Sequence, residues 1–132
     1  MKITADTNVL LRVVVPDDPK QQRVAVRTLN DADCVAISVH SLCELAWVMD
    51  RLYNAPRSEI SAAIRLLMNT RNVVLNRPAV EAGLAVFDAG GDFADGVIAF
   101  DGQWLGGETF VSFDKKAVSL LKEQGNSALL LR

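Results

Sequence analysis

The stretch KITADTNVLLRVVV, residues 2–15, sets a pattern that the rest of the chain repeats. Residues 2–5 predict a short strand, and Asp6-Thr7-Asn8 then opens an apolar helix over residues 9–15. The turn Pro16-Asp17-Asp18-Pro19 ends that helix, because proline cannot continue it. A strand therefore leads into a helix, with an acidic residue at the junction.

The same alternation of strands and helices continues to the end of the chain. We expect further strands at residues 34–37, 73–75, 109–112 and 129–131, and helices at about 20–31, 42–52, 58–68, 78–87, 92–104 and 114–124. No hairpin turn joins two successive strands, which favours a parallel sheet covered by helices on both faces. We therefore expect an α/β fold, a single domain over residues 1–132 with about five parallel strands.

Length and composition exclude several classes of protein. The chain has 132 residues, is 50% hydrophobic and carries a formal net charge of -2. That length fits one compact domain, and no apolar stretch is long enough to cross a bilayer. Residue 2 runs straight into a strand without a signal peptide, so we expect a cytoplasmic protein that does not bind membranes. Nucleic-acid binding would require local basic patches or a metal ion.

Four acidic residues, Asp6, Glu44, Asp95 and Asp114, are predicted to gather at one edge of the sheet. Asp6, Glu44 and Asp114 each follow a predicted strand, directly or within the first turns of the next helix. Asp95 starts the helix that leads back to the strand at residues 109–112. The carboxyl ends of parallel strands share one edge, which is where ligands usually bind.

Close carboxylates repel one another, and a divalent cation would offset that repulsion. Mg²⁺ prefers oxygen ligands and commonly retains several waters, and Mn²⁺ has similar preferences. Such an ion lowers the pKa of a bound water and can orient it toward a phosphodiester. The acids thus predict a Mg²⁺ or Mn²⁺ site that serves phosphodiester hydrolysis.

Each acid also has an ordinary structural explanation. Asp6 and Asp114 are suitable N-caps, Ser41-x-x-Glu44 has the form of a capping box, and Asp95 complements a helix dipole. Asp92 is either the N-cap of the helix that carries Asp95 or a fifth carboxylate near the metal. We interpret Asp92 as the cap.

Several polar and aromatic residues lie close in sequence to these acids. Asn8 and Ser112 are candidates for orienting carboxylates or waters. We interpret His40 as a turn residue, and Trp47 and Trp104 as packing residues rather than stacking platforms. Trp47 and Tyr53, with Met49, could equally mark an apolar contact surface for another subunit.

At these residues the sequence resembles the PIN-domain ribonucleases, and most closely the toxins of VapBC toxin–antitoxin pairs. The resemblance rests on motifs in the same order along nearly the whole chain: Asp6-Thr7-Asn8-Val9-Leu10-Leu11-Arg12, Ser41-Leu42-Cys43-Glu44-Leu45, Asp92-Phe93-Ala94-Asp95 and Phe110-Val111-Ser112-Phe113-Asp114-Lys115-Lys116-Ala117. Ser112 stands where many relatives have threonine, which preserves a hydroxyl group.

The resemblance implies a metal-dependent endoribonuclease with Asp6, Glu44, Asp95 and Asp114 as the metal-binding acids. It also implies a homodimer and a VapB-type protein antitoxin. Toxin and antitoxin together would bind the promoter DNA of their operon. The RNA targets of the family vary, and nothing in this sequence selects among them.

Two other function classes compete with this interpretation. One is a catalytically silent PIN-fold interaction module, which the presence of all four acids disfavours. The other is a receiver-type phosphoacceptor or another Mg²⁺-dependent α/β enzyme. A receiver would pair adjacent acids after the first strand and place a lysine late in the chain, whereas here Asp6 stands alone and Asp114 follows the late strand.

Overall fold

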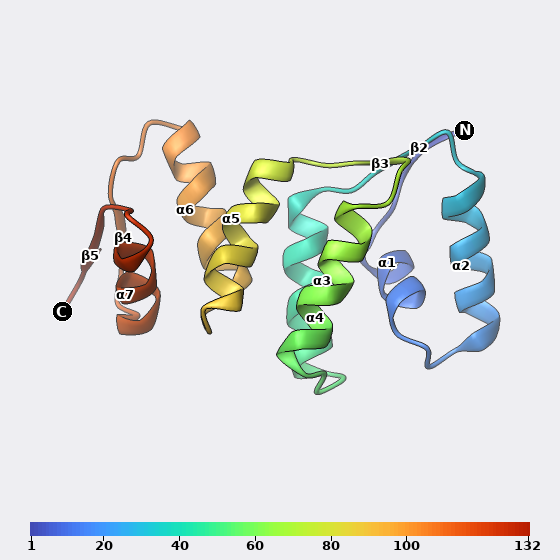
Figure 1. The fold of residues 1–132 in the computed structure, drawn as a ribbon, viewed down its shortest axis with the longest axis horizontal. Coiled ribbons are helices and arrows are strands. Elements are labelled where there is room, and N and C mark those ends of the chain that lie inside the picture. Colours follow the sequence, from blue (N-terminus) through green and yellow to red (C-terminus); the bar gives the residue numbers. More distant parts are fainter. The chain divides into compact units, whose positions relative to one another are not determined.

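The computed structural model describes every residue from Met1 to Arg132. The chain divides into two compact units, Met1–Asn76 and Arg77–Arg132. Seven helices and five strands follow one another in the order β1 (Lys2–Thr4), α1 (Thr7–Val14), α2 (Pro19–Asp31), β2 (Cys34–Ala36), α3 (Val39–Arg51), α4 (Arg57–Met68), β3 (Val73–Val74), α5 (Arg77–Asp88), α6 (Phe93–Trp104), β4 (Phe110–Ser112), α7 (Lys115–Glu123) and β5 (Ala128–Leu130) (Figure 1).

The first unit is built on a three-stranded parallel sheet. Its strand order is β1-β2-β3, with Ile3 opposite Val35 and Val35 opposite Val73. Val35, in the central strand, is fully buried. Parallel neighbours require a crossover, which α1 and α2 supply between β1 and β2 and which α3 and α4 supply between β2 and β3. In the strand order β1-β2-β3, the strand β1 lies at an edge of this sheet.

Apolar stripes hold the helices of the first unit together. Leu10 and Leu11 are the buried residues of α1, which packs against α2 and α3. The helices α3 and α4 lie side by side (Figure 1) and bury Leu45 and Ile64 completely. Because α1 and α3 are in contact, residues at their N-termini can reach one another.

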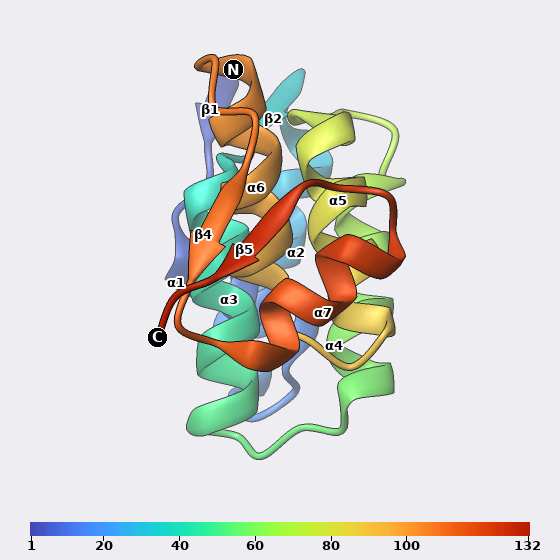
Figure 2. The same cartoon turned by 90° about the vertical axis from the view of Figure 1, so that its left-hand side faces the viewer.

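The second unit contains a two-stranded parallel sheet with α7 against one face (Figure 2). Val118 and Leu121 of α7 pack with Ala128 of β5 in the core of this unit. The opposite face of the sheet carries Val111 and Leu129, which are register partners and remain 53% and 52% exposed. Within this unit, α7 therefore covers one face of the two-stranded sheet.

The helices α5 and α6 pack at very short range through glycine. A Cβ at Gly96 would overlap the carbonyl oxygen of Ala82 and lie 2.8 Å from the Cα of Gly83. The ring of Phe93, which is fully buried, occupies the space that a Cβ at Gly83 would need. This contact fixes the start of α6, the helix that carries Asp95.

The structure confirms the α/β class and the parallel pairing of the strands. It places five strands in two sheets, one in each unit, so a single five-stranded sheet stays a prediction. One local interpretation was wrong: α3 begins at Val39 with Ser38 as its N-cap, so Ser41-x-x-Glu44 is not a capping box. Cys34 and Cys43 are free thiols and only partly buried.

We predict that Gly96→Ala destabilises the protein by about 3 kcal/mol, because backbone atoms of α5 cannot rotate away from the added methyl group. The measurement is urea unfolding followed by circular dichroism. Gly102→Ala is the matched control on the same helix, since a Cβ there meets nothing within 4 Å. The control should be neutral or gain up to about 1 kcal/mol. Equal effects of the two substitutions would contradict the close packing.

Candidate functional site

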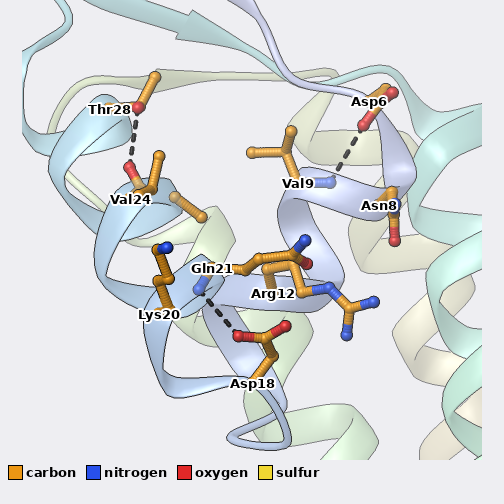
Figure 3. Close-up of a pocket in the computed structure, with 10 residues that line it drawn as sticks. Asp6, Asn8, Val9, Arg12, Asp18, Lys20, Gln21, Val24 and Thr28 are labelled. Atoms are coloured by element: carbon orange, nitrogen blue, oxygen red, sulfur yellow. Dashed lines mark hydrogen bonds between the residues drawn. The ribbon is translucent and has the colours of Figure 1, made fainter.

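Asp6 lies one residue beyond Ala5, which follows the end of β1, and it caps α1. Its backbone is extended, with φ -83° and ψ 170°, and its Oδ1 accepts a hydrogen bond of 3.0 Å from the N–H of Val9 (Figure 3). The side chain is exposed. This cap uses one carboxylate oxygen, so Oδ2 stays available for another ligand.

Glu44 lies in the second turn of α3, in contact with the start of α1. The hydroxyl of Thr7 donates to Glu44 Oε2 over 3.1 Å. On the other side of the carboxylate, His40 Nε2 is paired with Glu44 Oε1 at i,i+4 spacing on α3. Both carboxylate oxygens of Glu44 therefore have a partner, and one of these partners is the residue next to Asp6.

Asp95 and Asp92 lie at the start of α6 in the second unit. Asp92 is the N-cap, because its Oδ1 accepts from the N–H of Ala94 over 3.2 Å. Asp95 lies in the first helical turn and is half-buried. Burial raises the pKa of Asp95 above its ordinary value, and the nearby charges of Asp92 and Asp114 raise it further. These three acids of the second unit therefore interact.

Asp114 follows β4 and caps α7. Its Oδ1 accepts from the N–H groups of Lys116 at 2.9 Å and Ala117 at 3.2 Å. Ser112 shapes this turn, since its hydroxyl accepts from the N–H of Asp114 over 2.9 Å. Ser112 thus positions the backbone of Asp114 and not its carboxylate.

The donor chemistry of these acids fits a hard divalent cation. Asp6, Asp92 and Asp114 cap their helices through Oδ1, so capping does not exclude metal binding through Oδ2. Burial, and after it the charges of Asp92 and Asp114, raise the pKa of Asp95, and a cation would offset the repulsion from those two charges. Neither unit by itself brings together three or more potential metal-binding side chains of Asp, Glu, His or Cys.

A pocket of about 600 Å³ lies between α1 and α2, next to Asp6 (Figure 3). Asn8 and Arg12 line it from α1, and Lys20 and Thr28 line it from α2. Arg12 Nη1 is 3.0 Å from Asp17 Oδ1, and Tyr53 donates to Asp17 Oδ2 over 2.8 Å. The hydrogen bond from Tyr53, together with Arg12, lowers the pKa of Asp17. Arg12 is therefore held beside the pocket by an ionised partner.

Sequence reasoning missed the two partners of Glu44. His40 was interpreted as a turn residue, but it lies in the first turn of α3, where its i,i+4 spacing to Glu44 was a usable signal. Thr7 carried no such signal, because its contact joins residues 37 positions apart. Trp47 and Trp104 lie outside the cores of their units, since they are 56% and 78% exposed.

Comparison with known protein families identifies the chain. The sequence model of the PIN domain matches residues 3–120, which include all four acids and span both units. The chain belongs to the PIN domain family. No match to it was found among curated proteins.

The PIN domain is generally a nuclease fold, which supports a hydrolase that acts on nucleic acid. PIN nucleases generally use divalent metals, in agreement with the oxygen donors described above. None of the helices of this PIN domain combines the length and apolarity needed to span a membrane.

We predict that Asp95→Asn stabilises the metal-free PIN domain at neutral pH. The folded protein holds the Asp95 proton more tightly than the unfolded chain does, because the folded pKa is raised. Stability therefore falls as pH rises from the ordinary carboxyl pKa of 3.8 through the raised pKa of Asp95. The gain in free energy of unfolding from asparagine, the neutral isostere, should be present at pH 7. It should be absent at about pH 3, which is below both pKa values.

The measurement is urea unfolding in excess chelator at both pH values. Asp101→Asn is the matched control, because Asp101 lies exposed on the same helix. A gain for Asp95→Asn that persists unchanged at the lower pH would contradict an ionised Asp95 as the cause.

Proposed function

We propose that this PIN domain is a Mg²⁺- or Mn²⁺-dependent endoribonuclease, with Asp6, Glu44, Asp95 and Asp114 as its metal-binding acids. The observation that carries the proposal is the placement of Asp6 and Asp114. Each follows a parallel strand, and each caps the next helix through Oδ1 alone. A carboxylate oxygen therefore remains for a cation at the carboxyl end of β1 and of β4.

The proposal includes a single domain over residues 1–132 with about five parallel strands in one sheet. All strand pairs within the two sheets of the protein are parallel. The carboxyl ends of parallel strands share one edge, which is where acids that follow the strands would bind a cation.

Contacts within each unit link the other two acids to Asp6 and Asp114. Glu44 is tied to Thr7, the neighbour of Asp6, by a hydrogen bond, and Asp95 lies close enough to Asp114 to respond to its charge. The match of the PIN domain over residues 3–120 supports a single domain, since one domain of that family includes both units.

In the proposed reaction, a water attacks the phosphorus of an RNA phosphodiester and the P–O bond to the leaving oxygen breaks. The bound metal would lower the pKa of that water and offset negative charge on the phosphate. Asp6, Glu44, Asp95 and Asp114 would hold the ion. Asp92 and Ser112 fix the starts of α6 and α7. Asn8, the residue after Thr7, lines the pocket together with Arg12.

Exposed basic side chains of α2 could contact the phosphates of RNA. Lys20, Arg23 and Arg27 lie on one stripe of α2, and all three are exposed. Lys20 also lines the pocket that contains Asp6. A chain of net charge -2 can therefore still present positive charge near the proposed site.

The biological part of the proposal is a toxin of a type II toxin–antitoxin system. It rests on the VapBC-like motifs around the four acids. In this role the protein would act in the cytoplasm as a homodimer, and a VapB-type antitoxin would block its site. The complex of toxin and antitoxin would bind promoter DNA.

We predict that the purified protein cleaves single-stranded RNA with Mg²⁺ or Mn²⁺ and not in excess chelator. Asp6→Asn should lower the rate on the order of 100-fold or more while the helix cap is kept, because asparagine also caps well. The measurement is gel analysis of an end-labelled RNA.

Asp18→Asn is the matched control. Asp18 caps α2 with Oδ1 at 3.0 Å from the N–H of Gln21 and lines the same pocket, but it follows no strand. Its activity should stay near that of the wild type. Full cleavage in chelator, or equal loss in both variants, would contradict the metal mechanism. Cleavage of DNA alone would overturn RNA as the substrate.

The toxin role predicts that expression of the protein arrests bacterial growth and that Asp6→Asn does not. Co-expression of the adjacent open reading frame should relieve the arrest, because an antitoxin would cover the site. The measurement is growth after induction, with protein amounts compared by immunoblot. Normal growth with active, well-expressed protein would contradict the toxin role and leave the nuclease activity standing.

A further inference from the structure

We propose that Thr7 and His40 are positioning residues that hold Glu44 ready to bind the metal. The inference rests on the proposed function, since it assigns these residues a role at the same site. Its basis is that each oxygen of one exposed carboxylate has a separate partner: Thr7 at Oε2 and His40 at Oε1.

The hydrogen bond of Thr7 differs from those of Thr28 and Thr70. Thr28 and Thr70 donate their hydroxyls to the carbonyls of Val24 and Leu66, four residues back in their own helices. Thr7 is the first residue of α1, so no helical carbonyl lies four residues before it. Its hydroxyl crosses instead to Glu44 on α3.

This contact links two of the proposed metal ligands. Asp6 is fixed by the cap to Val9 N–H, and Thr7 follows it directly in the chain. Glu44, held by Thr7, is therefore tied to the same helix start as Asp6. Partners that orient metal-binding carboxylates commonly contribute 10- to 100-fold to metal affinity.

His40 restrains the second oxygen of Glu44. Its side chain is 83% exposed and that of Glu44 is 51% exposed, so burial does not hold this pair in place. A glutamate side chain has three rotatable bonds, and one partner would leave the carboxylate free to turn about the remaining contact. Two donors on opposite oxygens fix its plane and leave one lone pair on each oxygen for an ion.

The experiment measures Mn²⁺ affinity by electron paramagnetic resonance at one fixed pH, without RNA. Thr7→Val should weaken binding by about 10- to 100-fold, whereas Thr7→Ser should stay within about threefold because it keeps the hydroxyl. Thr70→Val is the matched control, since it loses a hydroxyl that bonds only to Leu66 O. Its Mn²⁺ affinity should equal that of the wild type.

A second pair of variants keeps the test independent of folding. His40→Ala should weaken Mn²⁺ binding and His40→Gln should restore part of it, because the amide of glutamine can also donate to Glu44. Since His40 is mostly exposed, both variants should unfold at the temperature of the wild type. Circular dichroism checks that every variant is folded.

The outcomes separate this inference from the proposed function. Unchanged affinity in folded Thr7→Val and His40→Ala would overturn the positioning role, as would equal loss in Thr7→Ser and Thr7→Val. If Asp6→Asn binds Mn²⁺ as tightly as the wild type, the proposed metal site is wrong, and this inference fails with it.

Discussion

The backbone N–H groups at helix starts are the constraint on which the candidate site depends. A helix leaves its first N–H groups without partners, and an aspartate before it satisfies one or two of them. In this protein Asp6, Asp92 and Asp114 do so at α1, α6 and α7. The caps hold the acids in defined orientations. The same bonds that start the helices therefore supply oriented negative charge.

Asp95 is the exception, because capping does not explain its position. It lies behind Asp92 in the first turn of α6, half-buried, where burial and the charges of Asp92 and Asp114 raise its pKa. The helix dipole favours a charge in this turn, but burial and repulsion outweigh it. A bound cation would offset this repulsion.

The sequence allowed the helices and strands to be predicted because each boundary has a local cause. Aspartate before an apolar helix marks the starts of α1, α6 and α7, and the absence of hairpin turns indicates parallel strands. The start of α3 was misplaced because Ser38 and Ser41 are both suitable caps, and only the structure shows that the hydroxyl of Ser38 accepts from Ser41 N–H. The bond from Thr7 to Glu44 depends on the packing of α1 against α3, which no short-range pattern encodes.

Topology, and not capping, separates Asp6 and Asp114 from Asp18. Asp18 and Asp6 both cap a helix through Oδ1 over 3.0 Å, so their local chemistry is nearly the same. Asp6 follows β1, whereas Asp18 follows the turn after α1. A strand delivers the acid that follows it to the carboxyl edge of a parallel sheet, and a turn between two helices does not. The same reasoning groups Asp114, after β4, with Asp6, and it explains how an ordinary N-cap can also serve as a metal ligand.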